Sequence, residues 1–166
     1  MDGTGVTLGA ATGSLRSDAP EATRAIGRAL GQAAHAGAML ALIGPLGAGK
    51  TELAKGVAEG LGVTSVVNSP TFVLMNEHAG RLRLFHIDAY RLDDPQEADA
   101  AGLFDERQAV GVAVVEWADR LVDRLPTDRL ELMLEPEPDG SDRRLIRWRA
   151  VGTQHRRLAD EALSRR

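Results

Sequence analysis

A phosphate-binding loop is encoded by eight consecutive residues, Gly44-Pro45-Leu46-Gly47-Ala48-Gly49-Lys50-Thr51. They match the pattern G-x-x-x-x-G-K-[ST] at every fixed position. The glycines let the backbone N–H groups curl inward, and a helix that begins at the end of the loop adds the partial positive charge of its N-terminus. Lys50 supplies an ammonium group to the outer phosphates, and the Thr51 hydroxyl is placed to ligate magnesium. The loop therefore predicts that the chain binds Mg-ATP.

Lysine usage supports this prediction. The chain has 20 basic residues, and only Lys50 and Lys55 are lysine. A lysine at the one place where a compact ammonium group must fit inside a phosphate loop indicates that chemistry requires that residue type. The alternative is a chance glycine turn at a helix start, and the segments on either side of the loop argue against it.

Those segments predict a strand before the loop and a helix after it. The run Ala38–Ile43 is wholly apolar and has glycine on both sides, which is typical of a strand buried on both faces. Apolar residues recur every fourth position from Leu53 to Leu61, so we expect a helix from Lys50 to Leu61 that stops at Gly62. Strand, loop and helix follow in the order that this kind of loop requires.

Two acidic residues are candidates for the catalytic partners of Lys50. Hydrolysis at such a loop needs a carboxylate at the end of a neighbouring buried strand, where it holds the metal or polarises the attacking water. Glu116 is the first charge after four apolar residues, and its alternative interpretation is an ordinary glutamate at a strand end. Asp88 ends a second strand-like run, and its alternative interpretation is a turn or cap aspartate.

His86 and Thr71 each allow both a functional and a structural interpretation. His86 could be a ligand or a base, but a single histidine in a strand is more often a hydrogen-bonded structural residue, and we rank that interpretation first. Thr71 follows Ser69-Pro70, and it could contact the terminal phosphate as switch threonines do. The segment could equally be a plain Ser-Pro turn.

The remaining patterns predict one α/β domain over residues 18–166, preceded by a flexible extension over residues 1–17 that is rich in Gly, Thr, Ser and Ala. We expect a three-layer fold of the P-loop NTPase type, whose mixed central sheet has a parallel core and antiparallel hairpin additions. The further elements expected are a helix from residue 18 to about 37, a hairpin of strands 71–77 and 81–88, a short helix opened by Asp94-Pro95, strands at 111–115, 130–134 and 145–150, and a closing helix at 154–163.

Composition limits the classes of protein to consider. No stretch of the 166 residues approaches the roughly 18 consecutive apolar residues of a spanning helix, so we expect no membrane contact and a cytoplasmic location. The absence of cysteine excludes disulfides and thiolate metal sites. Residues 143–166 contain eight arginines and only two acidic residues, Asp160 and Glu161. This basic segment could bind nucleic acid or an acidic partner. A solvated strand face and helix end is the favoured interpretation.

Four motifs in this order, GPLGAGKT, SPTF, HIDAYR and VVEW, closely resemble the TsaE (YjeE) family over roughly Asp18 to Val151. Pro45 stands where the family more often has Asp, Glu52 where a second Thr is usual, and His78 where Tyr is frequent.

The resemblance implies a small ATPase that works with the TsaB and TsaD proteins to make N6-threonylcarbamoyladenosine beside the anticodon of tRNA, and that meets tRNA only indirectly or weakly. It also implies phosphate contacts from Gly44 to Thr51, magnesium ligation by Thr51 and Glu116, and a nucleotide-responsive role for Asp88.

The main alternative function is a P-loop small-molecule kinase, which would pass the terminal phosphoryl group to a bound hydroxyl. Such kinases usually carry an arginine-rich lid, and the middle of this chain offers only Arg81, Arg83 and Arg91. A second alternative is a nucleotide-gated binding module whose output is partner assembly. A GTPase is disfavoured because the sequence has no N-K-x-D-like motif.

Overall fold

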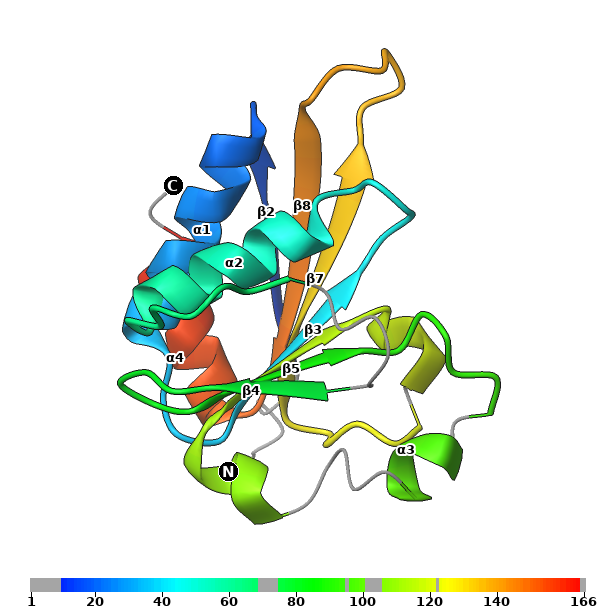
Figure 1. Cartoon of the computed structure of the whole chain (residues 1–166). Helices are drawn as coiled ribbons and strands as arrows, with labels where there is room; N and C mark the ends of the chain where they lie inside the picture. The colour runs from blue at the N-terminus through cyan, green and yellow to red at the C-terminus, as the bar shows by residue number, and fades with distance from the viewer. Residues whose placement is uncertain (1–9, 69–74, 95, 101–105, 122, 165–166) are drawn as a thin grey trace, which may run out of the picture.

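A computed structural model describes residues 10–68, 75–94, 96–100, 106–121 and 123–164 of the chain (Figure 1). The described strands form one seven-stranded sheet in the order β2-β8-β7-β3-β6-β5-β4. The strands are β2 (Ala11–Ser17), β3 (Ala38–Ile43), β4 (Met75–His78), β5 (Leu84–Asp88), β6 (Val112–Glu116), β7 (Arg129–Pro136) and β8 (Arg144–Val151). The helices are α1 (Pro20–Ala33), α2 (Lys50–Gly60), α3 (Gln96–Ala100) and α4 (Thr153–Ala162), with 3-10 turns η2 (Glu106–Val110) and η3 (Ala118–Leu121).

The sheet has a parallel centre and antiparallel margins. Strand β3 pairs in parallel with β6 and β7, and β6 pairs in parallel with β5. Strand β4 is antiparallel to β5, and β8 is antiparallel to both β7 and β2. The predicted α/β fold with a mixed sheet, parallel at its core and extended by antiparallel hairpins, is confirmed.

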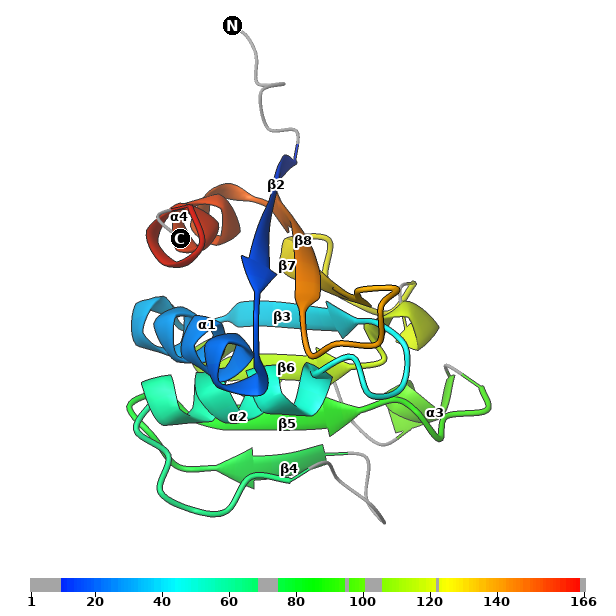
Figure 2. The same ribbon diagram turned by 90° about the horizontal axis from the view of Figure 1, so that it is seen from above.

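Two apolar cores lie on opposite faces of this sheet, which makes the fold three layers thick. On one face α1, α2 and α4 cover β3, β6, β7 and β8, with residues such as Leu30, Leu53 and Leu158 against Leu40 and Leu132. On the other face Leu92, Ala98 of α3 and Leu121 of η3 are among the residues that cover β3, β5 and β6. Figure 2 shows α3 beyond the carboxyl end of β5. No helix within the described ranges is both long and apolar enough to cross a membrane.

The N-terminal boundary of the domain was predicted wrongly. Residues 11–17 are not a flexible extension but strand β2, which pairs with β8 from Ala11↔Ala150 to Ser17↔Arg144. The composition is misleading because the small residues of β2 have a packing role: a Cβ on Gly13 would overlap the ring of Trp148. Leu15 and Ser17 are buried, so the segment belongs to the fold. Residues 1–9 lie outside the described residues.

Most other elements match their predictions within a few residues. The strand before the loop has the predicted bounds, and α2 ends one residue earlier than expected. Helix α1 begins at Pro20 and ends at Ala33, short of the predicted end near Gly37. The predicted hairpin exists as β4 and β5; β4 ends one residue later than expected, and β5 begins three residues later than expected. The part of its first strand at residues 71–74 lies outside the described residues.

Helices α1 and α2 touch backbone to backbone. They lie side by side in both views (Figures 1 and 2), and each presents two glycines four residues apart to the other. A Cβ on Gly27 or Gly31 would overlap carbonyl oxygens of α2, and a Cβ on Gly56 or Gly60 would overlap carbonyl oxygens of α1. Only glycine permits this separation, so the helix that follows the phosphate loop is fixed against its neighbour.

A buried histidine ties α4 to the sheet. The backbone N–H of Met39 in β3 donates to Nε2 of His155 at 3.0 Å. Burial, and then His35 at a ring-centroid distance of 5.1 Å, lower the pKa of His155, and Asp128 and the Val151 backbone oppose the shift, so that the pKa is about 4. Because Nε2 accepts a hydrogen bond, the neutral ring is the form that the fold requires.

Candidate functional site

The loop 44–49 lies where the sequence predicted it, between β3 and α2. Gly49 precedes α2 in a left-handed conformation with φ of 104°, and the helix begins at Lys50. Gly44 passes so close to β7 that a Cβ there would lie 2.7 Å from the carbonyl oxygen of Leu134. These two glycines let the backbone turn from the end of a buried strand directly into a helix N-terminus, which is the geometry of an anion cradle.

Lys50 is held inside the loop and is 5% exposed. Its Nζ donates to the carbonyl oxygen of Gly44 at 2.6 Å and to that of Pro45 at 2.8 Å. Burial lowers the pKa of the ammonium group, and the carboxylates of Glu116, Asp88 and Asp119 oppose that shift. The ammonium group is thus almost fully shielded from water and has acidic groups close by. Anionic phosphate oxygens would be better hydrogen-bond acceptors for it than its present carbonyl partners.

Glu116 links the loop to a second strand. This residue ends β6 and is 2% exposed, and its Oε1 accepts a hydrogen bond from the Thr51 hydroxyl at 2.9 Å. Its Oε2 lies 2.6 Å from Nε2 of His86, which is fully buried in β5. A carboxylate only accepts, so Nε2 of His86 donates. The structural role ranked first for His86 is therefore present, and it is to hold Glu116 toward Thr51.

Asp88 lies at the same edge of the sheet. It pairs with Glu116 in the parallel register of β5 and β6, so both side chains stand at the carboxyl ends of neighbouring strands. Its Oδ1 accepts the backbone N–H of Tyr90 at 2.9 Å, which is the turn role named as its alternative. Burial raises the pKa of Asp88, with the hydrogen bond from Tyr90 opposing. The residue has both roles open to it, since it caps a turn and also faces the loop.

These groups line one pocket of about 460 Å³. Its wall contains seven of the predicted site residues, which are Leu46, Gly47, Gly49, Lys50, Thr51, Asp88 and Glu116. Ala48, also in the loop, is fully buried. Thr71, the candidate switch residue, lies outside the described residues. The structure thus gathers the loop, its lysine and both candidate carboxylates around one space.

Comparison with known proteins identifies the family. Residues 17–145 match the family model described as threonylcarbamoyl adenosine biosynthesis protein TsaE. The chain belongs to the TsaE family. It is 43% identical over 143 residues to the tRNA threonylcarbamoyladenosine biosynthesis protein TsaE of Bacillus subtilis, covering 86% of this chain and 88% of that one. It is 38% identical over 154 residues to the protein of the same name from Mycobacterium leprae, covering 87% and 95%.

A solved structure supports the same assignment. The crystal structure of Bacillus subtilis YdiB superposes with a TM-score of 0.77 at 36% sequence identity, covering 92% of this chain and 95% of that chain. The resemblance to the TsaE family that the four motifs indicate is therefore confirmed, and the fold extends over nearly the whole length of both proteins.

Sequence reasoning missed one aromatic wall of the site in this TsaE family member. Trp117 directly follows Glu116, and its φ of 59° is the one positive value among described residues other than glycine. Its ring lies 3.9 Å from Nζ of Lys50, and its centroid lies 4.9 Å from that of Tyr90. A left-handed tryptophan costs about 1–2 kcal/mol, and here it turns the indole onto the lysine. An aromatic residue next to a strand-end carboxylate was the available signal.

The residues present in this TsaE fold fit ATP and magnesium. The Thr51 hydroxyl and the Glu116 carboxylate offer adjacent hard oxygen donors beside a phosphate loop. Mg²⁺ binds through few protein oxygens and completes its shell with water and phosphate, so these two oxygen donors suit it.

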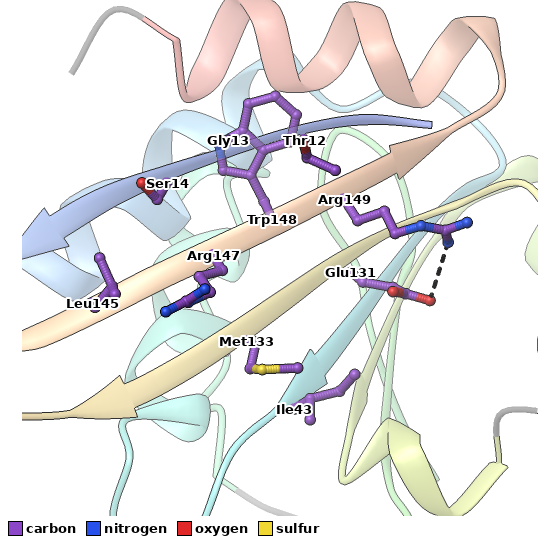
Figure 3. A pocket seen from close by; sticks show the side chains of 10 residues that line it. All are labelled: Thr12, Gly13, Ser14, Ile43, Glu131, Met133, Leu145, Arg147, Trp148 and Arg149. Atoms are coloured by element: carbon purple, nitrogen blue, oxygen red, sulfur yellow. Dashed lines mark ion pairs between the residues drawn. The ribbon is translucent and has the colours of Figure 1, made fainter. Parts of the chain in front are cut away.

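A second hollow of about 580 Å³ is lined by residues of β2, β8 and β7 and by Ile43 at the end of β3 (Figure 3). It is the uncovered face of β2, β8 and β7, where Met133 and Leu145 lie among charged side chains. Arg147 pairs with Glu135 at 3.0 Å, and Arg149 lies 3.8 Å from Glu131. These two arginines thus lie beside glutamates of the next strand, as expected for a solvated strand face.

Proposed function

We propose that this chain is a Mg-dependent ATPase that acts in tRNA threonylcarbamoyladenosine biosynthesis. The observation that carries the proposal is the convergence of Lys50, Thr51 and Glu116 around one phosphate loop in a member of the TsaE family. The relatives named above supply the biological process by their names. ATP and magnesium are the ligands for which the loop and its oxygen donors are best suited.

Each residue of the site then has a specific part. The N–H groups of the loop bind the phosphates, and Lys50 exchanges the carbonyls of Gly44 and Pro45 for phosphate oxygens. Thr51 and Glu116 would hold magnesium, which would supply positive charge to offset the negative charge that develops during phosphoryl transfer to water. Glu116 orients that ion or the attacking water, and His86 keeps the second carboxylate oxygen occupied so that the first stays directed at Thr51.

Asp88 is proposed to report the state of the nucleotide. Its carboxylate faces the loop and also caps the turn that leads to Tyr90 and Arg91, both of which line the same pocket. A change in charge at the terminal phosphate would therefore act on this turn directly. TsaB and TsaD are the proposed partners that recognise the outcome. Contact with tRNA is proposed to be indirect or weak, since Arg147 and Arg149 of β8 lie beside Glu135 and Glu131.

The test combines turnover with partner binding. Purified chain is incubated with Mg-ATP alone, and released phosphate is measured without any small-molecule acceptor. Size-exclusion chromatography with a TsaB and TsaD pair is then run with ATP, with ADP and without nucleotide. We expect slow phosphate release and an association that is strongest with ATP. No association under any condition would refute the pathway role, and phosphate transfer only to an added hydroxyl compound would favour the kinase.

A further inference from the structure

Arg144 holds the phosphate loop from outside the nucleotide pocket. It is the first residue of β8, and its guanidinium group donates from Nε to the carbonyl oxygen of Ala48 at 2.9 Å and from Nη2 to that of Gly47 at 3.1 Å. Its Nη1 donates to the carbonyl oxygens of Ser141 at 3.0 Å and Arg143 at 2.9 Å. One side chain thus joins the β7–β8 hairpin to the loop through four backbone carbonyls.

The topology explains how β8 reaches the loop. The loop leaves β3 beside the end of β7, where a Cβ on Gly44 or on Gly49 would meet Leu134. Arg144 pairs with Pro136 at the end of β7, so its side chain starts one strand farther from β3 and crosses toward the loop. The lining residues of the nucleotide pocket do not include it. The guanidinium group therefore acts on the backbone of the loop and leaves the ligand space open.

The two carbonyls that it binds determine two N–H directions. A peptide unit is planar and trans, so its C=O and N–H point in opposite directions. The carbonyl of Gly47 shares a peptide plane with the N–H of Ala48, which donates to the carbonyl oxygen of Pro45 at 3.1 Å. The carbonyl of Ala48 shares a plane with the N–H of Gly49. Fixing both oxygens on one guanidinium group orients both planes. The rigid fork of arginine suits this task because it presents two donors in a set geometry.

We propose that Arg144 is a positioning residue for phosphate binding: it orients the 47–48 and 48–49 peptide planes so that the loop is preorganised for the nucleotide's anionic groups. The inference rests on the proposed ATP binding by this loop. Preorganisation of the loop acts on every bound state that contains phosphate, so its loss raises the Kd for ATP and for ADP and raises KM more than it lowers kcat.

The competing role is that of a hairpin clasp, since Arg144 also binds Ser141 and Arg143. A clasp would affect the stability of the hairpin and leave nucleotide affinity unchanged. Arg144→Gln removes the fork, and Arg144→Lys keeps the charge but offers a single ammonium in place of the two fixed donors. Arg147→Gln is the matched control, because it removes an arginine from the same strand whose partner is Glu135 on the open face.

The experiment uses the full chain of each variant and of wild type. Calorimetric titration with Mg-ATP and with Mg-ADP gives Kd, steady-state phosphate release gives KM and kcat, and thermal melting without nucleotide gives stability. We expect Arg144→Gln to raise both Kd values about tenfold, as for loss of one strong hydrogen bond's worth of binding energy. We expect Arg144→Lys to be intermediate, and Arg147→Gln to bind as wild type does.

Each outcome decides the question. A Kd for Arg144→Gln within about twofold of that for Arg147→Gln, with a lower melting temperature, would establish the clasp and overturn the positioning role. If Arg144→Gln does not fold, Arg144→Lys decides: weakened binding of both nucleotides supports the proposal, and wild-type binding overturns it. Failure of wild type to bind ATP would overturn the proposed function as well, whereas normal wild-type binding with unchanged variants would overturn this inference alone.

Discussion

Replacing Glu116 with glutamine tests the chemistry of the site without disturbing its shape. The side chain is 2% exposed and lies between His86 at 2.6 Å and Thr51 at 2.9 Å. Glutamine can keep both contacts, because its carbonyl oxygen accepts from His86 and its amide donates to the Thr51 hydroxyl oxygen. We therefore expect Glu116→Gln to fold with a free energy of unfolding within about 1 kcal/mol of wild type.

The variant loses only the negative charge at the end of β6. Removing one preorganised electrostatic group from a transition state typically lowers turnover by about a hundred- to a thousandfold. Mg-ATP affinity should weaken by less than about tenfold, because Lys50 and the loop N–H groups still bind the phosphates in the ground state. The expected signature is therefore a large loss in kcat with a small change in Kd.

Phosphate release at saturating Mg-ATP, calorimetric titration and urea denaturation measure the three quantities. The matched control is Glu135→Gln, which removes a glutamate from the exposed pair with Arg147 on the open face of the sheet. We expect the control to turn over ATP as wild type does. Wild-type turnover in Glu116→Gln would show that the catalytic carboxylate lies elsewhere, and an equal loss in both variants would show that the effect is not specific to the site.

The remaining predictions address the loop, the switch, the helix pair and pH. Lys50→Ala should lose several-fold to about a hundredfold in ATP affinity by calorimetry, since one charge-assisted hydrogen bond is worth about 1.5–3 kcal/mol; unchanged affinity contradicts the loop assignment. Asp88→Asn should reduce both phosphate release and the preference of TsaB and TsaD for the ATP-bound chain on size exclusion; loss of only the former would remove its reporting role. Gly56→Ala should lower the free energy of unfolding by about 1–3 kcal/mol in urea despite alanine's higher helix propensity, because the Cβ overlaps the backbone of α1; a more stable variant refutes that packing. The pKa of His155 falls from 6.5 to about 4 on folding, so as the pH is lowered the unfolded chain binds the proton before the folded chain does. The contribution of His155 to the free energy of unfolding is therefore full above pH 6.5 and declines toward pH 4 by up to about 3 kcal/mol. His155→Gln should reduce this pH dependence in thermal melts recorded across pH.

Local patterns were sufficient to predict the parts of the site that local sequence determines. The loop, the strand before it and the helix after it follow one another in the chain. The position of Glu116 could be predicted because a buried parallel strand ends in its first charge, and its catalytic role stays a prediction. Strand β2 was missed because its pairing with β8 spans most of the chain and its small residues resemble a linker.

Other contacts were out of reach for the same physical reason. Arg144 lies 96 residues from Ala48, and no spacing rule relates a hairpin arginine to a loop carbonyl. The left-handed backbone of Trp117 depends on packing against Lys50 and Tyr90, which tertiary structure decides. The role of Thr71 stays a prediction.

The glycine contact between α1 and α2 determines which parts of the molecule are free to move. Two helices whose backbones touch have no side-chain layer to absorb a shift, so rotation or sliding of α2 would drive its carbonyls into α1. The helix that carries Lys50 and Thr51 is therefore a rigid reference frame. We therefore expect motion during the proposed nucleotide turnover to fall on the opposite side of the pocket, in the turn after Asp88 and around Trp117. That side lies at the carboxyl ends of β5 and β6, where Tyr90 is 45% exposed.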